Sequence, residues 1–437
     1  MPAPSLIIKE LSSDFTPDRL DQDLFEKPYF FLLESSLPSA EARYSIAAWD
    51  PVKIYRPQNN ENPFDFFEKE LASQKVESDL PFSGGWIGYF GYELYSHLES
   101  KVAPREPDLI PQSVFCLYES FYLYDHRGKK AFWVSSNHRS VPKIPPTPLS
   151  KKGGRDWSPP LKKGEWGDLS KQTYLQAVQK IKNFIEAGDC YQVNFSQRFS
   201  SATNLSPYQI YQNLCSTSPA PYAAFLNLGD VQIISSSPEC FLKLDGRHVT
   251  TRPIKGTRRR GKTAEEDQRL KEELEKSFKD HAELLMITDL ERNDLGRVCK
   301  PGSVQVTEQA TLESYAQVHH LVATIEGELS PQKTVMDLLR ATFPGGSITG
   351  APKVRAMQMI RELETHARNI YCGAIGFLSS NQKAHFNIAI RTLVLKDKTA
   401  HFWGGGGIVA DSTPHAEYEE TLAKAEGIVL ALDPDRG

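Results

Sequence analysis

The order of strand-like and helix-like segments limits the possible folds of this chain more than any other sequence feature. Short apolar runs follow one another through turn residues, as at 222–228, 231–235 and 240–244, and helical patterns lie between such groups. Strands joined by a short turn are antiparallel, whereas parallel strands need a long crossover. We therefore expect an α+β fold with antiparallel sheets, and not a doubly wound parallel sheet.

The remaining regular segments are predicted from apolar spacing and from the residues that bound them. Further strands are expected at 29–34, 44–49, 84–92, 115–124, 130–135, 191–195, 373–379, 385–395 and 400–403. Helices are expected at 64–71, 171–188, 264–295, 335–343, 353–364 and 417–432.

The chain has 437 residues, which suggests more than one folding unit. Its composition changes at 136–168, which is rich in Pro, Gly, Lys and Ser and contains the near-repeats 148–153 and 160–164. Such a segment is typical of a flexible insertion or linker. We therefore expect an N-terminal region at 1–135 and a larger region at 169–437.

Composition and charge exclude several classes of protein. The chain is 40% hydrophobic with a net charge of −4, so a general nucleic-acid-binding role is disfavoured. No apolar run is long enough to span a membrane, and the first residues do not resemble a secretory signal. The six cysteines form no Cys-x-x-Cys pair, so neither a zinc site nor a disulfide framework is indicated. These features predict a cytoplasmic protein that binds neither nucleic acid nor membrane.

A lysine in an unusual setting lies in the stretch 252–261, RPIKGTRRRG. Lys255 has arginines on both sides in the sequence, and a crowded ammonium loses its proton more easily. A neutral lysine amine is a nucleophile, so the stretch is a candidate for covalent catalysis. On these ten residues alone, a solvated basic loop or a nucleic-acid patch is an open alternative.

Acidic side chains on two predicted helices could hold a cation. Glu417, Glu420 and Lys424 are spaced to share one helical face, and four glycines at 404–407 precede that helix. Glu283 lies at the edge of an apolar face on another helix and needs a partner there. If the two helices meet, the three glutamates could bind Mg²⁺, which takes few carboxylates and leaves positions for substrate oxygens. A surface stripe of salt bridges is the alternative.

Three further sequence patterns bear on catalysis. The glycines at 345 and 350 have the spacing of a phosphate-binding loop, but Ala351 stands where the lysine is needed. His319 and His320 would face opposite ways on a strand, so at most one of them lines a site. No Gly-x-Cys-x-Gly or Gly-x-Ser-x-Gly elbow is present, so the chain has no recognisable amidase nucleophile.

Several motifs, in this order, resemble the chorismate-utilising enzymes, which include the large subunits of anthranilate synthase and aminodeoxychorismate synthase. They are 237–239 (SPE), 253–257 (PIKGT), 289–296 (DLERNDLG), 350–353 (GAPK), 407–412 (GIVADS) and 417–421 (EYEET). The resemblance covers nearly the whole chain outside the 136–168 insertion. It implies two large antiparallel sheets packed as a sandwich with helices on the outside, and a chorismate-binding catalytic domain at 169–437.

The resemblance also implies a set of site residues. Chorismate would bind at Gly256, Thr257, His320, Ser347, Tyr371, Arg391, Gly405, Gly407 and Lys424, and Mg²⁺ at Glu283, Glu417 and Glu420. Glu239 matches the general acid of the family, placed over the 4-hydroxyl that leaves. Arg391 and Lys424 suit the carboxylates of a dianion by charge.

Two positions divide the family by reaction. Anthranilate synthases usually carry alanine where this chain has Lys255, whereas aminodeoxychorismate synthases carry the lysine as a covalent nucleophile. Isochorismate and salicylate synthases place a water-activating lysine where this chain has Gln192. The resemblance therefore implies amination of chorismate to 4-amino-4-deoxychorismate for p-aminobenzoate and folate, with ammonia from a separate glutamine amidotransferase subunit. Anthranilate formation is the alternative.

The N-terminal region resembles the part of the family that forms a tryptophan pocket. Ser36, Tyr44, Pro221 and Tyr222 are the residues implied for that pocket. It could be a feedback site, a place for a structural tryptophan, or simply core. We favour core or a structural ligand over regulation, so the region 1–135 is expected to be an amino-acid-binding or structural subdomain.

Overall fold

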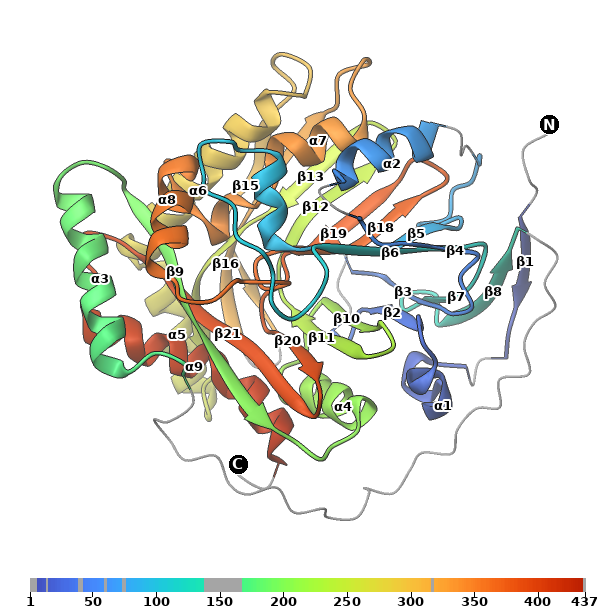
Figure 1. The fold of residues 1–437 in the computed structure, drawn as a ribbon, viewed down its shortest axis with the longest axis horizontal. Coiled ribbons are helices and arrows are strands. Elements are labelled where there is room, and N and C mark those ends of the chain that lie inside the picture. The colour runs from blue at the N-terminus through green and yellow to red at the C-terminus, as the bar shows by residue number, and fades with distance from the viewer. Residues whose placement is uncertain are drawn as a thin grey trace.

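The computed structural model describes residues 6–12, 15–37, 42–58, 61–72, 76–136, 167–315 and 318–434. The flexible insertion predicted at 136–168 therefore lies outside the described residues, apart from its two ends. Figure 1 shows the described elements arranged around two large sheets, with helices along the outside.

The first sheet has 11 strands. In spatial order they are β1 (Ile7–Glu10), β8 (Lys130–Ser135), β7 (Ser120–Asp125), β3 (Tyr44–Ala48), β2 (Phe31–Glu34), β10 (Tyr222–Asn227), β11 (Val231–Ser237), β20 (Thr392–Lys396), β21 (Thr399–Ile408), β9 (Gln192–Ala202) and β17 (Gly350–Ala351). The regions at 1–135 and 169–437 both contribute strands to this sheet, and they meet where β2 pairs with β10.

The second sheet has 10 strands. In spatial order they are β14 (Ile254–Arg259), β16 (Val318–Glu328), β13 (His248–Arg252), β12 (Cys240–Asp245), β19 (Ala384–Asn387), β18 (Ala374–Ser379), β5 (Gly85–Phe90), β6 (Ser113–Tyr118) and β4 (Lys53–Tyr55), and β15 (Gln305–Ser314) also pairs with β16. The regions at 1–135 and 169–437 meet here as well, because β5 pairs with β18.

The predicted α+β class with two large antiparallel sheets is confirmed. Neighbouring strands in both sheets run antiparallel throughout the described part of the chain. The ring of Phe31 on β2 contacts that of Tyr118 on β6, with centroids 6.0 Å apart, so the sheets pack face to face. Phe30 and Leu32 point the other way, into a second apolar cluster, as strand alternation requires.

Helices cover the outside of this sandwich. They are α1 (Gln22–Glu26), α2 (Pro63–Ala72), α3 (Lys171–Glu186), α4 (Pro207–Thr217), α5 (Ala264–Glu275), α6 (Phe278–Gly296), α7 (Val335–Thr342), α8 (Lys353–Leu363) and α9 (Pro414–Leu432), with the short 3₁₀ turns η1 (Pro17–Arg19), η2 (Tyr92–His97) and η3 (Gly346–Ile348). α9 packs on β21 and against α3 and α4, and α6 packs on β14 and β16 (Figure 1). No helix in the described ranges is both long and apolar enough to cross a membrane.

Three predicted segments are each divided in two. The run 115–124 is β6 in one sheet and β7 in the other, separated at Glu119, and 385–395 is likewise β19 and β20. Each run was wrongly predicted as one strand. The two halves are both largely apolar, so the sequence pattern shows no break where the chain passes from one sheet to the other. The helix predicted at 264–295 is α5 and α6, and Ser277 caps α6 by accepting a hydrogen bond from the backbone N–H of Asp280.

Candidate active site

Lys255 lies on β14, with its amine directed toward η3. Its Nζ donates a hydrogen bond to the backbone oxygen of Ser347 over 3.0 Å. Burial lowers the pKa of Lys255, and the carboxylate of Glu283 on α6 opposes this effect. The side chain is therefore a lysine that loses its proton more readily than an exposed one and that lies beside an acidic group.

The arginines next to this lysine have a different role from the one predicted. Arg258 pairs with Glu273 on α5 and with Asp280 on α6, over 2.8 and 3.1 Å, and Arg260 pairs with Asp267 over 2.7 Å. The causes that lower the pKa of Lys255 are burial first and then the cation Lys424, not the arginine run. Crowding in the sequence was the wrong reason, because the arginine charges are matched by carboxylates of α5 and α6.

Glu239 is buried between the last residue of β11 and the start of β12. Burial raises its pKa to about 6, while the Ser347 side chain and the Lys255 charge oppose the rise. The carboxyl thus lies near both Lys255 and η3 and can hold a proton near neutral pH. This is the property expected of a general acid.

α9 brings its polar face over the glycine run of β21. Lys424 donates a hydrogen bond to the oxygen of Gly405 over 2.9 Å and pairs with Glu420 over 2.7 Å. A β-carbon at Gly406 would lie 3.0 Å from Glu420 Oε1 and 3.1 Å from Glu417 Oε2, so both carboxylates lie directly against this glycine and a side chain there would displace them. The predicted shared face of Glu417, Glu420 and Lys424 is confirmed, and it faces the sheet.

The three predicted metal ligands do not form a preassembled cluster. No group of three or more His, Cys, Asp or Glu side chains in the described ranges is arranged to hold a metal ion. Glu283 pairs with Lys279 over 3.9 Å, but Oε2 of Glu417 is buried without a hydrogen-bond partner. Mg²⁺ needs only one or two protein carboxylates beside waters and substrate oxygens. The unpartnered oxygen of Glu417 and the neighbouring Glu420 therefore fit such an ion.

The two histidines diverge as strand geometry requires. His320 accepts or donates a hydrogen bond at Nδ1 with the Thr257 hydroxyl over 2.8 Å, and burial lowers its pKa to about 3. Its Nε2 is buried without a partner. His319 instead contacts Ser314 and Asp267, over 2.8 and 3.1 Å. The prediction that at most one of them lines the site agrees with this geometry.

An unpaired guanidinium lies near His320. The Arg391 side chain makes no hydrogen bond or ion pair with any residue that the structure describes, and burial is the cause that lowers its pKa. Its charge also contributes to the low pKa of His320, which places the two groups close together. Tyr371 is also buried, and its ring stacks on that of Trp403 with centroids 6.0 Å apart. A partly desolvated arginine without a carboxylate is suited to bind an anionic ligand.

Gln192 completes the polar surroundings of the glycine run. A β-carbon at Gly407 would lie 2.0 Å from Gln192 Nε2, so the amide lies directly over this glycine and would have to move for any larger residue. Both polar atoms of the Gln192 amide are buried without hydrogen-bond partners. Unsatisfied buried amides are costly, so this amide is available to a ligand at the site.

One acidic residue of the site region was not assigned a role from the sequence. Glu291 on α6 is buried and accepts a hydrogen bond from the Thr251 hydroxyl over 2.7 Å. Burial raises its pKa to about 8, and the nearby Glu239 charge adds to the rise. Glu291 lies on the buried face of α6 with Ile287, Thr288 and Asp294, and apolar periodicity gives no reason to expect a carboxylate at such a position.

A second cavity lies between the sheets, away from Lys255. It has a volume of about 330 Å³, and its lining includes Tyr44, Pro221 and Tyr222 of the predicted tryptophan pocket. Ser36 is not in the lining, because its hydroxyl donates a hydrogen bond to the backbone oxygen of Ala220 over 2.9 Å. The pocket is also bordered by charged side chains, namely Glu34, Arg43, Asp79, Lys243, Asp245 and Lys383. Space for a small polar ligand is therefore present there.

Comparisons with known proteins place this geometry in a family. The model of the chorismate binding enzyme family matches residues 29–429. Anthranilate synthase component 1 of Lactococcus lactis is 38% identical over 97% of this chain and 98% of its own. Aminodeoxychorismate synthase component 1 of Bacillus subtilis is 36% identical over 93% of this chain and 92% of its own. The crystal structure of anthranilate synthase component I from Streptococcus pneumoniae is 36% identical, covers 90% of this chain and 93% of that one, and has a TM-score of 0.79.

Proposed function

The chain belongs to the chorismate binding enzyme family, and from that premise we propose that it aminates chorismate to 4-amino-4-deoxychorismate. This is the reaction of an aminodeoxychorismate synthase component I. The observation that carries the proposal is the Lys255 amine, whose pKa is lowered by burial and which lies near Glu239, Glu283 and Glu420. A structural or surface lysine would have no need of this placement.

The proposed reaction uses Lys255 as a nucleophile. Its neutral amine attacks ring carbon 2 of chorismate while the 4-hydroxyl leaves carbon 4 as water with the proton of Glu239, and both ring double bonds shift. Ammonia then attacks carbon 4, both double bonds shift back, and the lysine leaves carbon 2 as a neutral amine; the new ammonium at carbon 4 can return a proton to Glu239. Two allylic displacements replace one difficult substitution, which is why a lysine is needed at this position.

The other groups bind and orient the substrate in this proposal. Arg391 and Lys424 pair with the two carboxylates of chorismate, and the neutral His320 and the Thr257 hydroxyl contact its polar substituents. Glu417 and Glu420, with Glu283, would hold Mg²⁺, which when bound would neutralise the ring carboxylate. Tyr371 and Ser347 would line the ring, with Gly256, Gly405 and Gly407 leaving room for it.

A second subunit is part of the proposal. The relatives named above are first components, which supports the existence of a partner component. Because no amidase nucleophile elbow occurs in this sequence, we propose that a glutamine amidotransferase subunit supplies the ammonia. The product would serve the synthesis of p-aminobenzoate and folate.

Anthranilate synthesis is the second candidate, and the 38% identity to the Lactococcus lactis enzyme favours it. One experiment separates the two reactions. The protein is incubated with chorismate, Mg²⁺ and ammonium salts, and the products are identified by chromatography and mass spectrometry. The proposal expects 4-amino-4-deoxychorismate without pyruvate. Release of pyruvate together with fluorescent anthranilate would refute it.

Substitution of the nucleophile tests the covalent step directly. Lys255→Ala should abolish formation of 4-amino-4-deoxychorismate while chorismate still binds, because the carboxylate-binding groups are retained. Lys262 is exposed and lies close to Lys255 in the sequence, so Lys262→Ala is the matched control and should keep full turnover. Unchanged turnover in Lys255→Ala would show that this lysine is not the nucleophile.

A further inference from the structure

A fully buried ion pair lies beneath the candidate active site. Arg368 is only 1% exposed and Glu364 5% exposed. The guanidinium donates from Nε to Glu364 Oε2 over 2.9 Å and from Nη2 to Glu364 Oε1 over 2.7 Å. It therefore binds the carboxylate through both oxygens, which fixes the plane of the arginine.

The remaining contacts of this pair reach three segments that carry site residues. Arg368 Nη1 donates to the oxygen of Ile348 over 3.0 Å, and Nη2 donates to the oxygen of Asn194 over 2.7 Å. Glu364 Oε1 also accepts from the N–H and the hydroxyl of Ser196, over 2.9 and 2.7 Å. The guanidinium carbon lies 5.7 Å from the centroid of the Tyr371 ring. η3, β9 and the loop before β18 are thus joined by one side chain and its partner.

Each of these contacts is one step from a site residue. Ile348 follows Ser347, whose oxygen accepts the hydrogen bond of the Lys255 amine. On β9, Asn194 is paired with Gly407 and Ser196 with Gly405 across the sheet. The ion pair therefore fixes the backbone that contacts the lysine and the strand behind the glycine run.

A buried ion pair is weak evidence for a contribution to stability. Removing two charges from water is costly, and an apolar replacement is often equally stable. Here Arg368 donates to Glu364 and to the backbone oxygens of Ile348 and Asn194, and the planar fork sets the relative positions of these groups. Lysine could supply the charge but not three donors in one plane.

We propose that Arg368, held by Glu364, is a positioning residue that places the Ser347 carbonyl, and through it the Lys255 amine, for reaction. The proposal rests on the proposed function, because Lys255 is taken as the nucleophile. A misplacement of about 1 Å at a reacting group costs about 100-fold in rate. Arg368 itself does not touch the reacting atoms.

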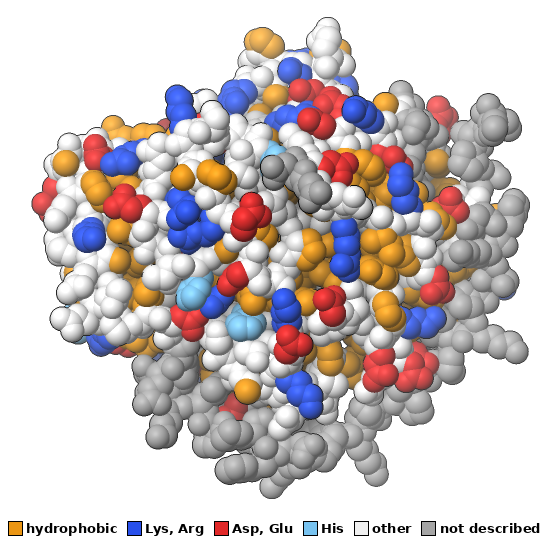
Figure 2. All heavy atoms as spheres, in the orientation of Figure 1, with side chains coloured by type: hydrophobic (Ala, Val, Ile, Leu, Met, Phe, Trp, Pro, Cys, Tyr) orange, Lys and Arg blue, Asp and Glu red, His pale blue; other side chains and the backbone are white. Residues whose placement is uncertain are grey.

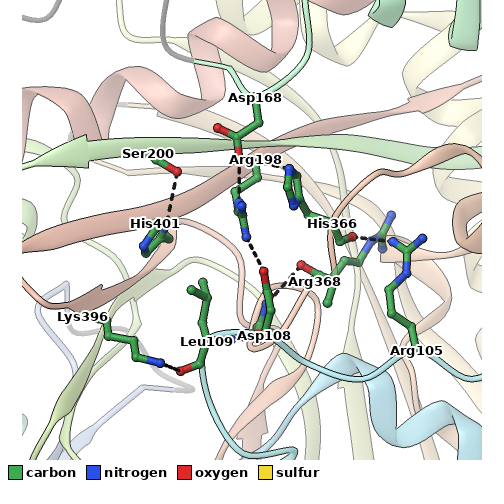
Figure 3. A network of polar contacts seen from close by, with 12 residues as sticks. Arg105, Asp108, Leu109, Asp168, Arg198, Ser200, His366, Arg368, Lys396 and His401 are labelled. Carbon is green, nitrogen blue, oxygen red and sulfur yellow. Dashed lines mark hydrogen bonds and ion pairs between the residues drawn. The ribbon is translucent and has the colours of Figure 1, made fainter.

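The chain offers a matched control in Arg105. Its guanidinium contacts the backbone oxygens of His366, Arg361 and Glu364, over 2.6, 3.0 and 2.8 Å. Figure 3 shows the Arg105 guanidinium at the backbone oxygen of His366, which lies two residues before Arg368. The ion pair of Asp108 with Arg198 is drawn beside them. Arg105 thus stabilises the turn that carries Glu364, and in the described part of the chain its side chain makes no hydrogen bond to η3 or β9.

The experiment compares Arg368→Lys with Arg105→Lys in the full chain. For Arg368→Lys, kcat with chorismate and ammonium should fall about 100-fold while KM for chorismate changes less than about threefold. Arg105→Lys should keep kcat within about twofold. An equal loss in both variants, or a change in KM alone for Arg368→Lys, would overturn the proposal.

Folding is measured for each variant by circular dichroism and thermal unfolding. If Arg368→Lys does not fold, Glu364→Gln replaces it, since the amide keeps the shape and removes only the charge; kcat should then fall about tenfold. If neither variant folds, the pair is a folding element and the proposal is overturned.

A substrate-free measurement separates this proposal from the proposed function. The acetylation rate of Lys255 is measured by peptide mass spectrometry, with Lys262 as the internal reference. Loss of the hydrogen bond to the Ser347 oxygen removes an acceptor that favours the Lys255 ammonium. Lys255 should therefore be acetylated at least about threefold faster in Arg368→Lys than in the wild type at neutral pH. Failure of the wild-type protein to aminate chorismate would refute the proposed function, whereas unchanged labelling of Lys255 would refute the positioning role.

Discussion

Glu291 provides a test of how the site region is stabilised. Its carboxyl is buried on α6, and burial raises its pKa from an ordinary 4.5 to about 8. The folded protein therefore holds a proton that the unfolded chain releases between these values. Because the folded-state pKa is the higher one, the stability of the fold falls as pH rises through this window. Glu291→Gln removes the titration and keeps an oxygen for the Thr251 hydroxyl.

The size of the effect follows from the two pKa values. Each pH unit between 4.5 and about 8 costs the wild-type protein about 1.4 kcal/mol relative to the variant. The difference therefore grows to at most about 5 kcal/mol at pH 8 and stays constant above it. Below pH 4.5 the carboxyl is protonated in both the folded and the unfolded protein, and the pH dependence disappears.

Urea unfolding at several pH values between about 5 and about 8, followed by circular dichroism, measures this difference. The exposed Glu275→Gln on α5 is the matched control. A free-energy difference between Glu291→Gln and wild type that does not change with pH would show that the carboxylate is ionised in the folded protein, and the burial argument would fail.

Three further outcomes are expected. Glu239 must carry the proton that it donates, and its pKa is raised to about 6, so the pH profile of kcat/KM should contain a group that must be protonated and that titrates near 6, which Glu239→Gln removes; an unchanged profile in that variant would contradict this. Glu417→Gln should weaken Mg²⁺ binding in calorimetry at least about tenfold, while the exposed neighbour Glu419→Gln should not; equal affinities would remove Glu417 from the metal site. Tryptophan at 100 times its Kd should stabilise the fold by about 2.7 kcal/mol by filling the second cavity without slowing turnover, and inhibition would indicate regulation instead.

The residues of the candidate site could be named from short local motifs and from the family resemblance that those motifs carry. The helical spacing of Glu417, Glu420 and Lys424 alone indicated a shared face, and the structure turns that face toward β21. The fold class was predictable for a similar reason, since short turns between strands permit only antiparallel pairing. Local patterns were therefore sufficient wherever the deciding contacts are close in sequence.

Other features depend on contacts between distant residues and left no local signal. Arg368 is bound by backbone oxygens of Ile348 and Asn194, and backbone acceptors have no signature in the sequence. The division of 115–124 between two sheets depends on which strands lie beside each half. The arginines at 258–260 were ambiguous until α5 supplied their carboxylates, because charge alone does not reveal its partner.

Figure 2 shows one face on which basic and acidic side chains are interspersed rather than separated by sign. The charges on that face therefore form no evident single-sign field. A long-range electrostatic attraction of the dianionic substrate is not expected from this face, so capture of chorismate would depend on the local cations of the pocket.

The pairing of β2 with β10 and of β5 with β18 has a consequence for how the protein is made. Neither half of the chain contains a complete sheet, so neither half can be exchanged or expressed as a module. Because β9 pairs along most of its length with β21, the strand behind the pocket also lacks this partner until nearly the whole polypeptide has been synthesised. Catalytic competence must therefore arise late in biosynthesis, and the nascent chain exposes unpaired strand edges for most of its translation.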